Sequence, residues 1–60
     1  MTIFELCALI DDLREMERNH TASEEAIIEF DREVRQWLFG NNELTIHNRE
    51  IAQDYYIKTL

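Results

Sequence analysis

The amino-acid sequence predicts an all-α protein, in which an antiparallel helical hairpin is followed by a shorter third helix. Two stretches place apolar residues at spacings of three and four. Each stretch opens with a threonine capping signal, and a single glycine follows the second. Sixty residues make one domain, 1–60, and so short a chain buries only about 60% of its unfolded surface. We therefore expect a homodimeric bundle.

The first helix is predicted to begin at residue 2 or 3, because Thr2 and Glu5 form a T-x-x-E capping box. Its apolar stripe consists of Ile3, Leu6, Ile10 and Leu13, extended by Leu9 and Met16. The residues expected to face water are Asp11, Asp12, Arg14, Glu15 and Arg18. The helix is expected to end near residues 18–20, with Asn19 as a left-handed stop.

The second helix is predicted to open at a repeat of the T-x-x-E signature, in which Thr21 is paired with Glu24. It runs to Phe39, with Gly40 as its C-terminal cap. Its apolar stripe consists of Ile27, Phe30, Val34 and Trp37, widened by Ile28, Leu38 and Phe39. Because the connection to the first helix is short, the two helices should lie antiparallel.

The third helix is predicted to start between Asn42 and Asn48, although the β-branched residues 44–46 also allow a short strand or a loop. Its apolar residues fall on several faces. One stripe holds Leu44, Ile51, Tyr55 and Lys58, its neighbour holds Ala52, Tyr56 and Leu60, and Ile46 and Ile57 lie elsewhere. So wide a spread favours a contact with a second copy or a partner. Tyr55, Tyr56 and Leu60 are the candidates, with a core position equally open for Tyr56.

The net charge of −7 is confined to the first half of the chain. Residues 1–31 contain nine acids and two arginines, whereas residues 32–60 contain four acids and four basic residues. An acidic protein is unsuited to direct binding of nucleic-acid phosphate or an anionic membrane. We expect a protein partner with a basic surface, bound through Asp11, Asp12, Glu15 and Glu25, although a merely solvated face is equally open.

Residues for catalysis are not apparent, and we expect no enzyme activity and no cofactor. Cys7 lies among apolar neighbours, which raise a thiol's pKa and make it inert, and a single cysteine fits a reducing compartment. Glu17-x-x-His20 resembles the ligand pattern of carboxylate-bridged di-metal bundles, with Glu24 or Glu25 as a further ligand. The first helix is expected to end there, however, and we predict that no metal is bound.

These observations favour a non-enzymatic acidic regulator or inhibitor that binds another protein, as expected of a phage or mobile-element accessory protein. Mimicry of nucleic acid by the carboxylates is a special case. The alternatives are a small structural subunit that stabilises a larger complex through apolar helix faces, and a metal-dependent enzyme built on Glu17 and His20. The apolar residues 3–10 are too few to span a bilayer and follow no basic region, so we expect a cytoplasmic protein, of a cell or of an infected host.

Overall fold

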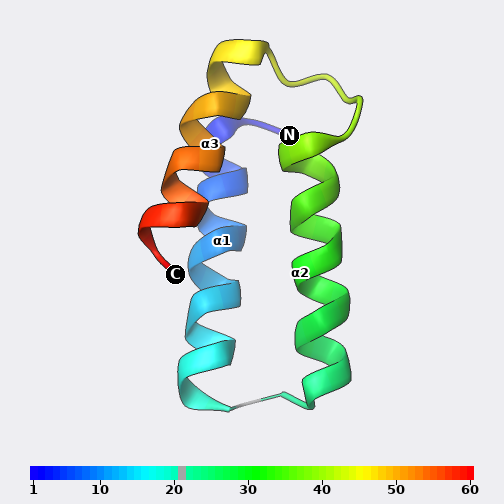
Figure 1. Ribbon diagram of the computed structural model, residues 1–60, viewed down its shortest axis with the longest axis vertical. Coiled ribbons are helices and arrows are strands. Elements are labelled where there is room, and N and C mark those ends of the chain that lie inside the picture. Colours follow the sequence, from blue (N-terminus) through cyan, green and yellow to red (C-terminus); the bar gives the residue numbers. More distant parts are fainter. Residues whose placement is uncertain (21) are drawn as a thin grey trace.

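Three α-helices form the described part of the chain, residues 1–20 and 22–60, in a computed structural model. They are α1 (Ile3–Asn19), α2 (Glu24–Phe39) and α3 (Ile46–Lys58), and each packs against the other two. In Figure 1 the chain descends along α1, ascends along α2 and descends again along α3, which lies in front of α1. The all-α prediction is confirmed, and residues 44–46 form no strand.

Helices α1 and α3 begin at threonine caps. The Oγ1 atom of Thr2 accepts a hydrogen bond from the N–H of Glu5 at 3.1 Å, and Oγ1 of Thr45 accepts one from the N–H of Asn48 at 3.1 Å. Each hydroxyl satisfies an amide of the first turn, which has no partner within its own helix. The predicted starts of both helices are confirmed.

Helix α1 ends at Asn19, within the predicted range of residues 18–20, but its left-handed residue is not the predicted one. His20, and not Asn19, adopts the left-handed conformation, with φ 52° and ψ 38°. The N–H of His20 donates to the carbonyl oxygen of Met16 at 3.0 Å, so this residue satisfies one of the last free carbonyls of the helix. The prediction of Asn19 as the stop was wrong because Asn19 itself is still helical.

Helix α2 begins at a serine cap. The Oγ atom of Ser23 accepts a hydrogen bond from the N–H of Ala26 at 3.2 Å, and the first helical residue is Glu24. The predicted cap, Thr21, lies outside the described residues. A capping box headed by residue 21 would have started the helix two residues earlier, so the predicted start was wrong.

Gly40 ends α2 as predicted, but not through a left-handed backbone. Its φ is −86°, and its N–H donates to the carbonyl oxygen of Gln36 at 2.9 Å. A Cβ atom at this position would lie 2.5 Å from that oxygen, so close approach is what requires glycine. The side-chain amide of Asn42 donates to the carbonyl oxygen of Trp37 at 3.0 Å and completes the end of the helix.

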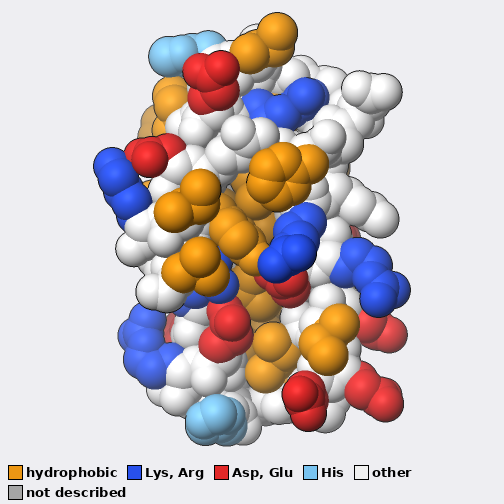
Figure 2. Space-filling view, in the orientation of Figure 1, with side chains coloured by type: hydrophobic (Ala, Val, Ile, Leu, Met, Phe, Trp, Pro, Cys, Tyr) orange, Lys and Arg blue, Asp and Glu red, His pale blue; other side chains and the backbone are white. Residues whose placement is uncertain are grey.

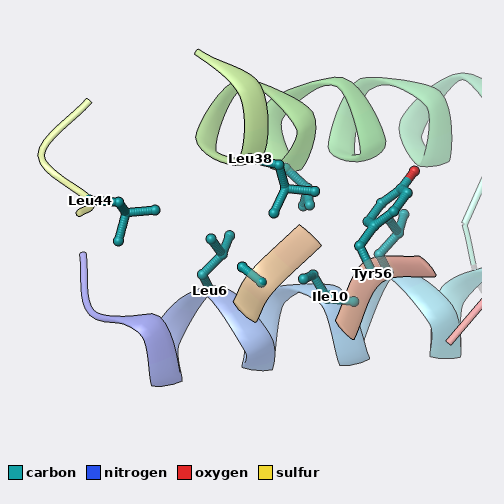
Figure 3. Packing of buried hydrophobic residues seen from close by; sticks show 8 residues of the cluster. Leu6, Ile10, Leu38, Leu44 and Tyr56 are labelled. Carbon is teal, nitrogen blue, oxygen red and sulfur yellow. The ribbon is translucent and has the colours of Figure 1, made fainter. Parts of the chain in front are cut away.

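The core lies where the three helices meet. In Figure 3, Leu6 and Ile10 of α1 point toward Leu38 of α2, with Tyr56 of α3 and the loop residue Leu44 beside them. Among the described residues, the buried apolar ones are Leu6, Ile10, Leu13, Val34, Leu38, Leu44, Ala52 and Tyr56. The stripe predicted for α1 therefore supplies the centre of the core.

The predicted apolar stripes of α2 and α3 are only partly buried. On α2, Ile28 is 50% exposed and Phe39 is 65% exposed. On α3, Ile46 and Ile57 are exposed, as expected for other faces, and Ile51 is also 44% exposed. No helix within residues 1–20 and 22–60 is both long enough and apolar enough to cross a membrane.

Candidate functional site

Two of the four predicted acidic contact residues, Asp11 and Glu15, line the same hollow between α1 and the end of α3. This hollow has a volume of about 390 Å³. Its lining residues are Asp11, Arg14, Glu15, Arg18 and Thr59. Asp12 is exposed on α1 next to it, whereas Glu25 belongs to the first turn of α2 and does not line it. We call Asp11, Asp12 and Glu15 the acidic surface.

The acidic surface is joined to α3 by a hydrogen bond. The hydroxyl of Tyr55 donates to the carboxylate of Asp11. This bond stabilises the protonated phenol, and together with partial desolvation and the negative charge of Asp11 it raises the pKa of Tyr55. The ring of Tyr55 is half-buried against the core. Two residues predicted separately, an acid and an aromatic contact, are thus neighbours.

Cys7 also lies where α1 packs against α3, close to Asp11 and Tyr55. The thiol is half-buried, and burial together with the charge of Asp11 raises its pKa. A raised pKa keeps the thiol protonated at neutral pH, and the protonated form is a poor nucleophile. The interpretation of Cys7 as an unreactive residue agrees with this environment, although its burial is only partial.

Tyr56 occupies the core rather than the surface, with 7% of the residue exposed. Two guanidinium groups lie over its ring, with the Cζ atoms of Arg14 and Arg35 at 4.4 Å and 5.9 Å from the ring centroid. Its hydroxyl donates to the carboxylate of Asp31 and accepts from Nε of Arg35 at 3.2 Å. Of the three predicted apolar contact residues, this leaves the half-buried Tyr55 on α3 and the exposed Leu60 at the chain end as surface residues.

Arg14 was predicted to face water but is 7% exposed. Its Nη2 donates to the carbonyl oxygen of Tyr56 at 2.9 Å, its Nε to Oγ1 of Thr59 at 3.2 Å, and its Nη1 to Glu17 at 2.6 Å. The positive charge of Arg14 near the C-terminal carbonyl groups of α3 also interacts favourably with the dipole of that helix. The sequence contains one indication that Arg14 is partly buried. It lies four residues after Ile10, so its long aliphatic stem falls beside the apolar stripe.

Glu17 and His20 line a hollow of about 430 Å³ at the turn between α1 and α2. Glu24, the predicted further ligand, lines the same hollow. The carboxylate of Glu17 is paired with Arg14, however. Within residues 1–20 and 22–60, no three His, Cys, Asp or Glu side chains are grouped so that they could hold a metal ion. The expectation that no metal is bound stays a prediction.

Comparison of the chain with models of protein families, with curated proteins and with solved structures gave no match. The described residues define a small acidic helical bundle.

Proposed function

We propose that this protein is a non-enzymatic regulator that binds a basic surface of another protein. The acidic surface and the adjoining residues Tyr55 and Leu60 form the contact. The observation that carries this proposal is the hydrogen bond between Asp11 and Tyr55, which places carboxylates and an aromatic edge on one seam. Protein interfaces commonly combine an aromatic centre with a polar rim, so this chemistry suits a protein partner.

The distribution of charge supports the same proposal. All of the net negative charge belongs to residues 1–31, and crowding like charges destabilises a compact state. A net charge of magnitude about 2–8 already secures solubility for a small domain, without any concentration on one part of the chain. A basic partner would explain why the negative charge is concentrated in residues 1–31, because complementary charge accelerates association and orients the encounter.

The test is affinity capture from an extract of the native host, with two variants of equal charge. Asp12→Asn/Glu15→Gln neutralises the acidic surface but leaves the Asp11–Tyr55 bond in place. Glu29→Gln/Glu33→Gln removes the same charge from exposed positions of α2. We expect wild type and the α2 variant to capture the same protein and the acidic-surface variant to lose it.

With that captured protein, the association rate should fall several-fold for the acidic-surface variant at low salt. The difference should shrink at high salt, because steering is screened over about 8–10 Å. Equal association rates for all three proteins at low salt would show that the carboxylates serve only solubility.

We propose in addition that the protein is a homodimer, in which the α1–α2 hairpin of each copy is antiparallel. The reason is the amount of apolar surface. Seven large apolar side chains among the described residues are between 44% and 84% exposed, and patches of this kind commonly mark interaction surfaces.

The same exposure favours a second candidate function, a structural subunit that docks into a larger complex through apolar helix faces. Hydrophobic docking is not weakened by salt. Capture that persists at high salt and is unaffected by Asp12→Asn/Glu15→Gln would therefore support this second function over the first.

A further inference from the structure

Helices α2 and α3 lie side by side on the broadest side of the molecule, which the second half of α1 completes (Figure 1). Viewed down its shortest axis, the Cα trace measures 32 by 19 Å, and hydrophobic side chains gather along the line between the two helices (Figure 2). Four large apolar residues of these two helices are at least half exposed. They are Ile28, Phe39, Ile46 and Ile57, with exposures of 50–75%. We call this surface the α2–α3 face.

Two contacts establish which edges of α2 and α3 border each other. Nε of Arg35 donates to the hydroxyl of Tyr56 at 3.2 Å, and Nε2 of Gln53 donates to the carbonyl oxygen of Leu38 at 2.6 Å. Arg35 and Gln53 each belong to a helical stripe with the same spacing of four, three and four. The stripes are Ile28, Arg32, Arg35 and Phe39 on α2, and Ile46, Glu50, Gln53 and Ile57 on α3.

These stripes bring apolar residues from both helices to one side of the molecule. Phe39 and Ile28 lie four and seven residues from Arg35, and Ile57 and Ile46 lie four and seven residues from Gln53. Residues at these separations share a helix face. The exposed apolar residues of each stripe therefore share a helix face with Arg35 or Gln53, at the boundary between α2 and α3.

We infer that the α2–α3 face is the surface through which two copies of this chain associate. The inference rests on the homodimer proposed above and assigns its interface. Charge is the first argument for a second copy as the occupant. Residues 32–60, which supply most of this face, contain equal numbers of acidic and basic side chains. Two copies meeting here avoid the like-charge repulsion that contact between two acidic surfaces would create.

The charged members of the stripes also fit a twofold interface. In such an interface the same patch of each copy meets its equivalent, so the patch has to be complementary to itself. Arg32 on α2 and Glu50 on α3 give the face both signs of charge. A strongly basic or strongly acidic partner would find no such match, because either arginine or glutamate would meet its own sign.

A stable dimer has to bury only a modest part of the surface of this chain. A typical specific interface buries about 800 Å² on each partner. The chain exposes 4376 Å² in total, so that area corresponds to roughly a fifth of its surface. The other large apolar residues that are exposed in the described part of the chain are Phe4 on α1, Ile51 on α3 and Leu60 at the chain end, and none of them belongs to the two stripes. Dimerisation would also add burial to a chain too short to bury a large core alone.

The test compares Phe39→Glu and Ile57→Glu with the control Phe4→Glu, which adds the same charge to a residue that is 84% exposed on α1. Sedimentation equilibrium should give wild type and the control twice the 7.3 kDa mass of one chain. The two face variants should dimerise at least tenfold more weakly, with helical circular dichroism showing whether they remain folded. A monomeric wild-type protein, or a control weakened as much as the face variants, overturns the assignment.

A second measurement needs no substitution. In a mixture of isotope-labelled and unlabelled wild-type protein, filtered nuclear Overhauser spectra report only contacts between copies. We expect such contacts from the Phe39 ring and the Ile57 methyl groups, and none from Phe4. Contacts that arise from Phe4 instead would overturn the assigned face and leave the homodimer standing. Neither outcome depends on the basic partner, whose binding is tested separately with the acidic-surface variant.

Discussion

Replacing Arg14 with methionine should detach the end of α3, because methionine keeps the aliphatic stem and removes the guanidinium. The change removes charged hydrogen bonds to the carbonyl oxygen of Tyr56 at 2.9 Å and to Thr59 at 3.2 Å. It also removes the cation–π contact at 4.4 Å. A hydrogen bond from a charged donor contributes about 1.5–3 kcal/mol, and a partly desolvated cation–π contact about 1–2 kcal/mol.

Two effects reduce the net loss. Glu17 is 44% exposed, so its ion pair with Arg14 contributes less than about 1 kcal/mol. Methionine also avoids the cost of desolvating a buried guanidinium. We therefore expect Arg14→Met to lower the free energy of unfolding by about 2–3 kcal/mol. A domain of this length has a total stability of about 3–9 kcal/mol, so the melting temperature should fall by about 10–20 °C.

The assay is thermal and urea unfolding followed by circular dichroism, with all proteins at the same concentration because dimerisation couples to stability. Arg18→Met is the matched control, since Arg18 is exposed one turn further along α1 and should change stability by no more than about 0.5 kcal/mol. In Arg14→Met, amide hydrogens in the last turn of α3 should exchange faster. Equal unfolding midpoints for the two variants would refute the assignment of Arg14 as the anchor of α3.

Three further predictions concern packing, the α2 cap and pH. Leu38→Ala should lower the free energy of unfolding by about 2–5 kcal/mol and Phe30→Ala by less, because Leu38 is fully buried and Phe30 only partly. If urea unfolding showed a larger loss for Phe30→Ala, the position of the core would be contradicted. Gly40→Ala should cost about 1–3 kcal/mol, since its Cβ would meet the Gln36 oxygen, and an unchanged melting curve would argue against that close approach. The raised pKa of Tyr55 contributes stability that is fully present below the unfolded pKa of about 10 and is lost as pH rises through the folded pKa. Absorbance titration should show this pKa lowered in Asp11→Asn, and an unchanged titration would exclude the hydrogen bond as its cause.

Local chemistry explains what could be predicted from the sequence. The stripe of Leu6, Ile10 and Leu13 is fully buried because its spacing of four and three leaves one orientation that removes all three side chains from water. The helix start at Thr2 also depends only on residues within one turn. At the second start, two hydroxyl side chains compete within three residues, and sequence spacing alone cannot decide which of them caps the helix.

Contacts between distant residues explain what could not be predicted. Arg14 is buried by its contacts with Tyr56 and Thr59, which lie more than forty residues away at the end of α3, and the sequence around Arg14 does not predict these two partners. The core position of Tyr56 depends likewise on Asp31 and Arg35 of α2. For the candidate site, the sequence identified Asp11 and Tyr55 separately, and only the packing of α1 against α3 brings them together.

The unequal burial of the helices offers a physical reason for the two surfaces. Helix α1 contributes three fully buried apolar side chains, so it is held by the core and tolerates the repulsion among its exposed carboxylates. Helix α3 contributes only Ala52 and Tyr56 to the core and leaves Ile46 and Ile57 in water. Helix α2 likewise contributes only Val34 and Leu38 and leaves Ile28 and Phe39 exposed, so both helices gain from a contact outside the chain. A dimer formed through the α2–α3 face would cover these residues and leave the acidic surface of each copy free. Two such surfaces on one particle would strengthen binding to a repeated basic target without any new contact.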